Sequence, residues 1–232
     1  MQQVVAFTAN NRPDYMRETV ESWNKVRGIE DAHVIVRVEP GNPEVEKAAS
    51  LLNGRLLEGH TNPVQYGALS NPWHALETAF SFGYPFAILA EDDSPVADDV
   101  LEYFRWCEIR YHGDQDILAV CAFQHDAQGG PKEVIRQARF VPTVWGIWRD
   151  RWEKRLRDDW DHDYTHKGWD WRINEHWIQE RRFLTIGPGQ SRSQVSGEHG
   201  GTHLRAGAEY QAHLSTCFSP HYEPGYYEEI EQ

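Results

Sequence analysis

Short apolar runs alternate with amphipathic segments along the first half of the chain, and this alternation restricts the possible folds more than any other feature. Each run ends in turn-forming residues, and each following segment has helical spacing. The predicted strands lie within residues 3–13, 32–43, 84–93 and 116–126, and the predicted helices within residues 15–26, 44–54, 71–83 and 96–113. Strands that alternate with helices predict an α/β fold with a mainly parallel sheet, whose ligands bind at the carboxyl ends of the strands.

Two residues mark where predicted helices begin. Asp14 is suited to cap the helix within residues 15–26, because a short acidic side chain can accept hydrogen bonds from backbone N–H groups. Pro72 is expected in the first turn of the helix within residues 71–83, where its missing N–H has no intrahelical partner to lose.

Composition, charge and cysteine content exclude several classes of protein. The chain has 232 residues, of which 40% are hydrophobic, which is typical of a folded protein rather than a disordered one. A formal net charge of -13 argues against a general polyanion-binding surface. The cysteines Cys107, Cys121 and Cys217 are too scattered for a disulfide framework or a zinc site, so we expect packing roles and a reducing compartment. Without a signal-peptide pattern or an apolar run of about 18 residues, we expect a soluble cytoplasmic protein with no membrane partner.

Three consecutive carboxylates, Glu91, Asp92 and Asp93, end the buried strand predicted within residues 84–93. Adjacent like charges repel, and a divalent cation would relieve the repulsion because Mg²⁺ and Mn²⁺ prefer oxygen ligands. The cluster therefore indicates a Mn²⁺ or Mg²⁺ site at a strand end beside a ligand crevice. The alternative is that Asp92 or Asp93 caps the helix that follows.

Tryptophan is concentrated in the second half of the chain. Seven of the ten tryptophans stand between positions 145 and 177: Trp145, Trp148, Trp152, Trp160, Trp169, Trp171 and Trp177. The first three have the spacing i, i+3 and i+7, which predicts one buried stripe on a helix.

Asp170 is the candidate general base in this region. It stands between Trp169 and Trp171, and two large rings would partly desolvate its carboxylate, raise its pKa and make it a better base. The alternative is an ordinary Asp at a helix start in a crowded loop.

The chain closes with a Gly- and Ser-rich loop at residues 187–211 and an acidic tail at residues 221–232. The loop is too long and polar for a simple turn, and such loops often close over a ligand. It carries His199 and His203, either of which could complete a metal site, contact phosphate or simply lie on the surface. The tail is expected to be frayed or draped over the surface.

Five sequence blocks resemble one enzyme family in their order and spacing. They are the strand that ends in EDD, YFRW at 103–106, FVPTVWGIWRDRWEK at 140–154, GWDWR at 168–172 and SGEHGG at 196–201. Over residues 3–205 the chain resembles the inverting GT-A glycosyltransferases of the alpha-1,3-mannosyl-glycoprotein 2-beta-N-acetylglucosaminyltransferase type and the related protein-O-mannose N-acetylglucosaminyltransferases. This resemblance implies one GT-A domain over residues 1–232. Its nucleotide-sugar and metal-binding half would be residues 1–125, and its acceptor-binding half, with the catalytic base and a flexible loop, residues 126–215.

The resemblance also implies roles for the acidic residues and one histidine. Asp93, the last carboxylate of the triplet, would contact Mn²⁺ directly, while Glu91 and Asp92 would face the ribose and sugar portions of the donor. Asp170 matches the family's catalytic base. His199 matches the His of the flexible loop that closes on the donor beside the metal.

Five further residues would bind the nucleotide sugar. The resemblance implies that Arg12 lies by the nucleotide. Glu39 stands where the family has an Asp that reads uracil, and Asn71 approximately where it has a uracil-contacting His, so both positions depart from the family. Trp145 and Trp169 belong to a wall that suits sugar recognition, because apolar sugar faces stack on aromatic rings.

The resemblance implies transfer of a sugar, N-acetylglucosamine or glucose, from a UDP-sugar to an acceptor hydroxyl, with Mn²⁺ or Mg²⁺ and inversion at the anomeric carbon. The family's membrane anchor and stem are not expected here, which suits a bacterial or viral enzyme, including one in a phage-infected host. The acceptor could be a glycan, a protein or a hydroxymethylpyrimidine in phage DNA. For DNA, six arginines could form a phosphate-binding face or be solvated helix surface: Arg149, Arg151, Arg155, Arg157, Arg181 and Arg182.

Two alternatives come from other functional classes. A non-catalytic carbohydrate-binding module would use the tryptophan wall without consuming a donor. A metal-dependent nucleotidyltransferase or pyrophosphatase would also use a carboxylate cluster, but it would release pyrophosphate or a nucleoside monophosphate instead of a nucleoside diphosphate.

Overall fold

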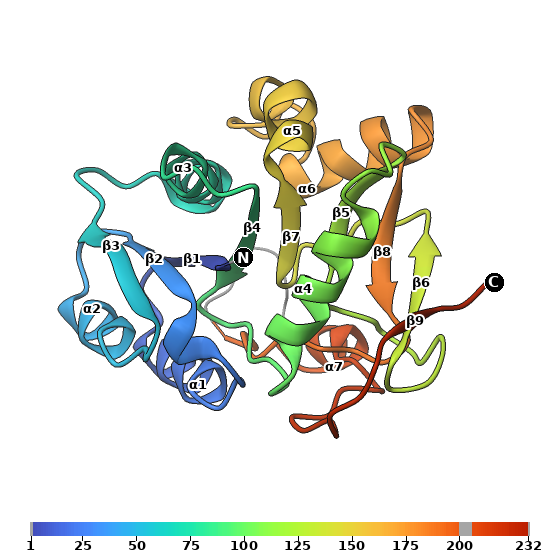
Figure 1. Ribbon diagram of the computed structural model, residues 1–232. Coiled ribbons are helices and arrows are strands. Elements are labelled where there is room, and N and C mark those ends of the chain that lie inside the picture. Colours follow the sequence, from blue (N-terminus) through green and yellow to red (C-terminus); the bar gives the residue numbers. More distant parts are fainter. Residues whose placement is uncertain (1, 200–205, 232) are drawn as a thin grey trace.

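The computed structural model describes residues 2–199 and 206–231, and within these ranges it forms a nine-stranded sheet of order β3-β2-β1-β4-β7-β5-β8-β6-β9 (Figure 1). The strands are β1 Val4–Ala9, β2 His33–Val38, β3 Arg55–Thr61, β4 Phe86–Glu91, β5 Ile117–Cys121, β6 Glu133–Gln137, β7 Trp145–Trp148, β8 Leu184–Pro188 and β9 Glu228–Glu229. The helices are α1 Pro13–Trp23, α2 Pro43–Ala49, α3 Gly67–Ser81, α4 Val100–Tyr111, α5 Arg149–Arg151, α6 Trp169–Arg172 and α7 Ala208–His213, with 3₁₀ turns at Ile29–Asp31 and Arg157–Asp159 and π-helical segments at Trp152–Leu156 and Ile173–Glu180. Most strand pairs are parallel, which confirms the predicted α/β fold.

Both faces of the sheet are buried around β1 and β4. Val5 and Phe7 of β1 pack in the same core cluster as Trp23 of α1, whereas Val4 packs with Leu76 of α3 in the cluster on the other face. Helices on both faces explain why β1 and β4 are continuous apolar runs rather than alternating ones. β1 pairs in parallel with β2 and β4, so the carboxyl ends of these three strands lie at one edge.

Strand β7 replaces the first part of the predicted tryptophan helix. Trp145 and Trp148 lie in β7, which is antiparallel to β4 and β5, and Trp152 begins the helical part. Side chains three residues apart in a strand point to opposite faces, and these two tryptophans belong to opposite core clusters. The helix prediction is wrong for residues 145–148, because a strand buried on both faces can carry the same apolar spacing as a helix.

The predicted cap of α1 is also wrong. Asp14 lies inside the first turn of α1, where it pairs with Arg17. The helix begins at Pro13, and among the described residues no side chain caps it.

Helix α3 begins five residues earlier than Pro72, so this proline stands inside the helix rather than in its first turn. A proline inside a helix leaves the carbonyl four residues earlier without its N–H donor. Here that carbonyl belongs to Ala68, and it accepts a hydrogen bond from Nε1 of Trp169 at 3.3 Å. The tryptophan-rich region thus compensates for the proline that sequence reasoning placed at the helix start.

The predicted packing role of the cysteines holds for two of the three. All three cysteines are free, with Cys107 and Cys121 buried and Cys217 partly exposed. Within the described ranges, each helix is too short or too polar to cross a bilayer.

The acidic tail is ordered against the sheet, contrary to the expectation of a frayed end. Tyr222 and Tyr227 are buried, and β9 pairs in parallel with β6. Acidic composition indicated solvent exposure, but Tyr222 and Tyr227 supply apolar surface that the tail buries.

A buried arginine joins this tail to the loop after β8. Arg192 and Asp99 are both 0% exposed, and Nε of Arg192 lies 2.9 Å from Oδ1 of Asp99. The Tyr227 hydroxyl donates to Oδ2 of Asp99 at 2.6 Å, and Lys132 Nζ donates to the same oxygen at 2.7 Å. The guanidinium carbon of Arg192 lies 3.7 Å from the centre of the Tyr222 ring. Charge and aromatic packing together hold the tail, the loop and the start of α4.

Replacing Arg192 by Ala is expected to lower the free energy of unfolding by about 3–5 kcal/mol, because it leaves the buried Asp99 carboxylate without its arginine. Arg17→Ala is the matched control, since Arg17 is partly exposed and its surface ion pairs with Asp14 and Glu44 contribute at most about 1 kcal/mol each. Urea denaturation of both variants measures the difference. Equal losses in the two variants would show that the buried pair does not hold the tail.

Candidate active site

A cavity of about 470 Å³ lies at the carboxyl ends of β1, β2 and β4, the edge where ligands were expected. The predicted site residues that line it are Arg12, Glu39, Asn71, Glu91, Asp92, Asp93, Trp169 and Asp170. The structure thus brings together residues that are up to 158 positions apart, because α6 and the loop before it reach the ends of the first strands. Trp145 and His199 are not part of the lining.

Arg12 joins two of the three consecutive carboxylates. Its guanidinium pairs with Asp92 and lies 2.8 Å from Oδ2 of Asp93. Asp92 is buried, and its other carboxylate oxygen accepts a hydrogen bond from the Asn10 N–H at 2.9 Å. Neither aspartate caps the following helix, which starts at Val100, so the capping alternative is wrong. The loop after β1 and the end of β4 are therefore held together by opposite charge.

Acidic side chains outnumber basic ones in the cavity lining, with Glu39, Glu91, Asp92, Asp93 and Asp170 against Arg12 and Lys167. Burial, Asp93 and Asp92 raise the pKa of Glu91 to about 8, against the lowering effect of Arg12, and Asp170 raises it further. Burial is the largest of these causes, and the neighbouring carboxylates add to it. Asp170 at the start of α6 and the cluster at the end of β4 line the same cavity, so they belong to one site.

The donor set fits a divalent cation that is held together with a ligand. Among residues 2–199 and 206–231, no three His, Cys, Asp or Glu side chains converge into a metal-binding group. Mg²⁺ and similar ions are commonly bound by one or two carboxylates together with phosphate oxygens of a substrate, so such a group is not required. Gly197 lies close to the Asp93 carboxylate. A Cβ atom added at position 197 would lie 2.2 Å from Oδ2 of Asp93, so any residue other than glycine would crowd the carboxylate. Of the two aspartates that pair with Arg12, Asp93 is the more exposed to the cavity, with 17% of its side chain exposed against 4% for Asp92.

Of the two histidines of the late loop, only His199 lies within the described residues. The His199 side chain is 74% exposed, and its backbone N–H donates to the Tyr15 hydroxyl at 2.9 Å. His203 lies outside the described residues. A third histidine, His213 of α7, does line the cavity, and its Nδ1 lies 2.7 Å from the carbonyl oxygen of Glu209. Sequence reasoning missed His213, because only the Gly- and Ser-rich loop at residues 187–211 was considered and His213 lies after it.

Glu39 and Asn71 line the cavity, and the side chain of each accepts hydrogen bonds from other residues of the protein. The Glu39 carboxylate accepts from the N–H groups of Tyr66 at 2.9 Å and Gly67 at 2.8 Å, which are at the start of α3. A carboxylate is favoured there because the helix N-terminus is positive. The Asn71 side chain accepts from Nδ2 of Asn62 at 2.9 Å. Each carboxylate or amide oxygen keeps a second lone pair that a ligand could use.

The tryptophan wall has a buried layer and an exposed edge. Trp169 stacks on Trp160 with ring centres 4.7 Å apart, and on Trp145 at 5.8 Å. Trp145 is fully buried, so it supports Trp169 from behind rather than facing the cavity. Trp171 is 51% exposed at the cavity, with Lys167 Nζ 4.9 Å from its ring centre.

Asp170 is the second residue of α6 and faces the cavity, partly exposed. Gly168, the residue before the helix, has φ 115°, and a Cβ atom there would lie 3.1 Å from Oδ1 of Asp170. Glycine is therefore needed both for this backbone conformation and for the close approach of the carboxylate. Asp170 stands at a helix start, as expected if it were an ordinary residue of a crowded loop. It also lines the same cavity as the carboxylate cluster Glu91, Asp92 and Asp93.

The cavity also contains residues that sequence reasoning did not select. Asn10 and Lys167 line it beside Arg12 and Trp169. Lys167 could have been noticed because it stands three positions before the candidate base. Asn10 gave no such signal, since it reads as an ordinary turn residue after β1.

The arginines proposed for DNA lie away from this cavity. Trp148 pairs with Phe86, the first residue of β4, so Arg149 follows at the opposite end of that strand from Glu91. Arg149 donates to the carbonyl oxygen of Tyr84, and Arg151 is fully buried. Burial rules out both readings for Arg151, a phosphate-binding face and a solvated helix surface, because its guanidinium group binds backbone carbonyls inside the protein.

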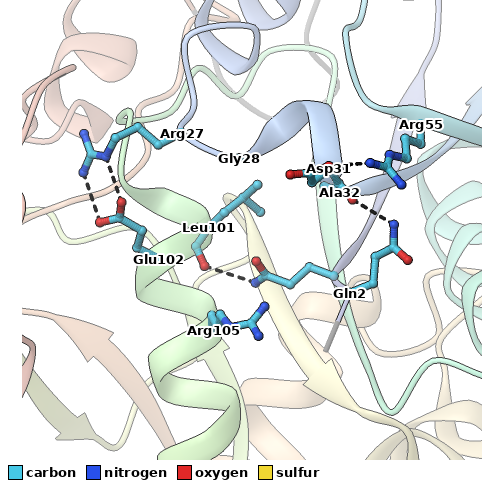
Figure 2. A pocket seen from close by; sticks show the side chains of 10 residues that line it. Gln2, Arg27, Gly28, Asp31, Ala32, Arg55, Leu101, Glu102 and Arg105 are labelled. Carbon is cyan, nitrogen blue, oxygen red and sulfur yellow. Dashed lines mark hydrogen bonds and ion pairs between the residues drawn. The ribbon is translucent and has the colours of Figure 1, made fainter.

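A second cavity, of about 490 Å³, lies at the amino ends of the first strands (Figure 2). Two of its arginines face acidic partners: Arg27 binds Glu102 at 2.8 Å, and Arg55 pairs with Asp31. Its lining has three arginines, Arg27, Arg55 and Arg105, against two carboxylates, Asp31 and Glu102, in contrast to the acidic cavity at the carboxyl ends.

No protein-family model matches the chain, and no curated protein matches it. Among solved structures, a mannosyltransferase from Pyrobaculum calidifontis in complex with GDP-Man and Mn²⁺ has a TM-score of 0.55 and 16% identity, over 87% of this chain and 59% of that one. The TarS 1-349 fragment from S. aureus has a TM-score of 0.57 and 12% identity, over 85% of this chain and 61% of the fragment. A protein from Desulfovibrio desulfuricans G20, described as a nucleotide-diphospho-sugar transferase, has a TM-score of 0.53 and 12% identity, over 91% of this chain and 94% of that one.

These similarities concern the fold. This chain spans 59% and 61% of the lengths of the first two proteins, and identities of 12–16% do not carry an activity across. The chain therefore has the GT-A fold, the α/β fold of the nucleotide-diphospho-sugar transferases, as its sequence predicted.

The raised pKa of Glu91 predicts that the metal-free protein loses stability as pH rises. The folded pKa of about 8 exceeds the usual value of 4.5, so the folded state holds a proton that the unfolded state releases between these values. In chelator, Glu91→Gln is expected to melt at a higher temperature than wild type at pH 8, with little difference at pH 5. Glu21→Gln, on the exposed side of α1, is the control. A lower melting temperature for Glu91→Gln than for wild type at pH 8 would contradict the charge assignment.

Proposed function

We propose that this protein is a metal-dependent inverting glycosyltransferase that moves a sugar from a nucleoside diphosphate to an acceptor hydroxyl. The observation that carries the proposal is that a carboxylate cluster at the end of β4 and a separate carboxylate, Asp170 on α6, line one cavity of this fold. The mannosyltransferase neighbour was solved with GDP-Man and Mn²⁺, and S. aureus TarS 1-349 with UDP and with UDP-GlcNAc. For this chain we propose a UDP-sugar donor that carries N-acetylglucosamine or glucose.

Donor binding is proposed for residues 1–125. Asp93, next to Arg12, would hold Mn²⁺ or Mg²⁺ together with the donor's phosphate oxygens, which agrees with the excess of carboxylates over cations in the cavity lining. When bound, the cation neutralises the negative charge that develops on the departing diphosphate. Arg12 orients both aspartates, and Glu91 and Asp92 would face the ribose and the sugar. His199 would join them only if its loop moves over the donor, since its side chain is exposed.

The nucleotide base is proposed to lie near Glu39 and Asn71. Both residues line the cavity, and the hydrogen bonds that they make within the protein fix their orientation. Trp169 supplies the apolar wall, and Trp145 supports Trp169 by stacking behind it. A wall of this kind also excludes water that would hydrolyse the donor.

The chemical step is assigned to Asp170 on the acceptor side, within residues 126–215. The acceptor oxygen forms a bond to C1 of the sugar while its proton passes to the Asp170 carboxylate. The bond from C1 to the diphosphate oxygen breaks, and the nucleoside diphosphate leaves with the electron pair. Attack from the face opposite the diphosphate inverts the configuration at C1.

The acceptor is proposed to approach beside Trp171, the exposed ring at the cavity. A glycan, a protein side chain or a modified pyrimidine would each present a hydroxyl there. The buried Arg151 and the carbonyl-bound Arg149 give the DNA acceptor no support.

A donor screen tests the binding step. UDP-N-acetylglucosamine, UDP-glucose, UDP-galactose and GDP-mannose are each added with Mn²⁺ or with chelator, and the melting temperature is measured. We expect one UDP-sugar to raise it only with Mn²⁺, because a ligand that binds the folded state stabilises it by mass action. Asp93→Asn should lose this shift, whereas Asp158→Asn, an exposed control, should keep it. Absence of any shift in wild type would favour a carbohydrate-binding module.

Asp170→Asn separates binding from chemistry. We expect the variant to keep the Mn²⁺-dependent thermal shift and to lose donor turnover about 10²–10⁴-fold, the usual effect of removing a general base. Release of nucleoside diphosphate is measured for this variant and for Asp158→Asn. Full turnover by Asp170→Asn would mean that another group accepts the proton.

A further inference from the structure

Asp161 organises the loop that leads to the candidate base. Its side chain is 4% exposed, and its carboxylate accepts four backbone hydrogen bonds. Oδ1 accepts from the N–H groups of Asp163 at 3.3 Å and Thr165 at 3.1 Å, and Oδ2 from those of His166 and Gly168, both at 2.8 Å. A carboxylate suits this place because it only accepts hydrogen bonds, and all four neighbours donate.

The loop needs such support because its backbone is unusual. Tyr164 has φ 61° and Lys167 has φ 67°, in the left-handed region that non-glycine residues seldom adopt. Gly168 follows with φ 115°. Residues in such conformations persist where surrounding interactions hold them, and Asp161 bonds the amides on both sides of Lys167.

The end of this loop is the floor of the active site. Lys167 and Gly168 line the cavity, and Oδ1 of Asp170 lies against Gly168. The Gly168 carbonyl accepts from the Arg172 N–H at 3.0 Å, so the first turn of α6 starts at the residue whose N–H Asp161 holds. A shift of Gly168 would therefore move Asp170.

The tryptophans beside the loop are anchored independently of Asp161. Nε1 of Trp160 donates to the Leu69 carbonyl at 2.7 Å, and Nε1 of Trp169 donates to the Ala68 carbonyl. The stacked rings would hold the wall in place if the loop between them loosened. The effect of changing Asp161 should then be concentrated on Gly168 and Asp170.

We propose that Asp161 is a positioning residue that places the Asp170 carboxylate for proton transfer through its hydrogen bonds to the loop. This inference rests on the proposed function, in which Asp170 is the general base. Asp161 itself does not line the cavity, and its four bonds are all within the loop.

The test compares Asp161→Asn with Asp163→Asn, each in the wild-type chain and in the Asp170→Asn chain. Asn is nearly the same size as Asp, but one of its two side-chain acceptor oxygens becomes an NH₂ donor. This donor would face backbone N–H groups that also donate, so two of the hydrogen bonds are lost. Asp163 is the control because it is exposed in the same loop. The assay is Mn²⁺-dependent release of nucleoside diphosphate, with water as acceptor, from the four donors of the screen.

Asp161→Asn is expected to lower kcat about 10- to 100-fold with the donor KM unchanged, since a small misplacement of a catalytic group has effects of this size. Asp163→Asn should stay within about twofold of wild type, because its exposed carboxylate accepts from Thr165 and not from the Gly168 N–H that leads to Asp170. In the Asp170→Asn chain, Asp161→Asn should cause no further loss, because the base it positions is gone. Equal losses in both chains would overturn the proposal, because they would indicate a purely structural role.

Amide hydrogen exchange provides a readout that needs no donor. In Asp161→Asn we expect faster exchange within residues 162–172 and unchanged exchange within residues 145–160. Faster exchange throughout the protein, or failure to fold, would assign Asp161 to the whole fold and contradict the proposal. If wild type releases no nucleoside diphosphate from any donor, the proposed function fails, whereas unchanged exchange at residues 162–172 refutes the positioning role by itself.

Gly168→Ala is a second variant that leaves Asp161 intact. Its Cβ would crowd Oδ1 of Asp170, and alanine is strained at this φ. The same fall in kcat with unchanged donor KM is expected. A normal kcat in this variant would contradict the proposal that the position of Gly168 determines the position of the Asp170 carboxylate.

Discussion

The excess of negative charge at the end of β4 is the constraint on which the rest of the site depends. Arg12 pairs with Asp92 and Asp93, yet Glu91 still has its pKa raised to about 8. A protein keeps such a cluster at some cost to its own stability, which is a common feature of functional sites. A divalent cation and the phosphates of a nucleotide sugar would complete the charge balance. The parallel strands then matter because they bring the loops after β1, β2 and β4 to one edge.

Much of the first half could be predicted from sequence because its strands are buried on both faces. The apolar runs that form β1, β2, β4 and β5 are unambiguous, and the carboxylates directly after β4 pointed to the cavity. β3 was missed because it is an edge strand with exposed residues, such as Leu56 at 62% exposure, and has no clear apolar run. The fold prediction was confirmed, because the alternation of strands and helices carries most of the topology.

The second half was harder because its structure depends on contacts between distant segments. A helical spacing suited Trp145 and Trp148, but tertiary packing placed them in a strand with one ring on each face. The tail is held by the buried pair of Arg192 and Asp99, which no local pattern reveals. Likewise, nothing in the sequence DHDYTHKG distinguishes Asp161, since its importance comes from four backbone N–H groups that turn toward it.

The central claim is that this cavity transfers a sugar with loss of a nucleoside diphosphate. Identification of the nucleotide product tests it most directly: the purified protein is incubated with Mn²⁺ and each UDP-sugar, and the nucleotides are separated by anion-exchange chromatography. The account predicts that UDP accumulates in proportion to the sugar released or transferred. Accumulation of UMP would instead show cleavage within the diphosphate, as in a pyrophosphatase, and would contradict the assignment of C1 as the reacting centre.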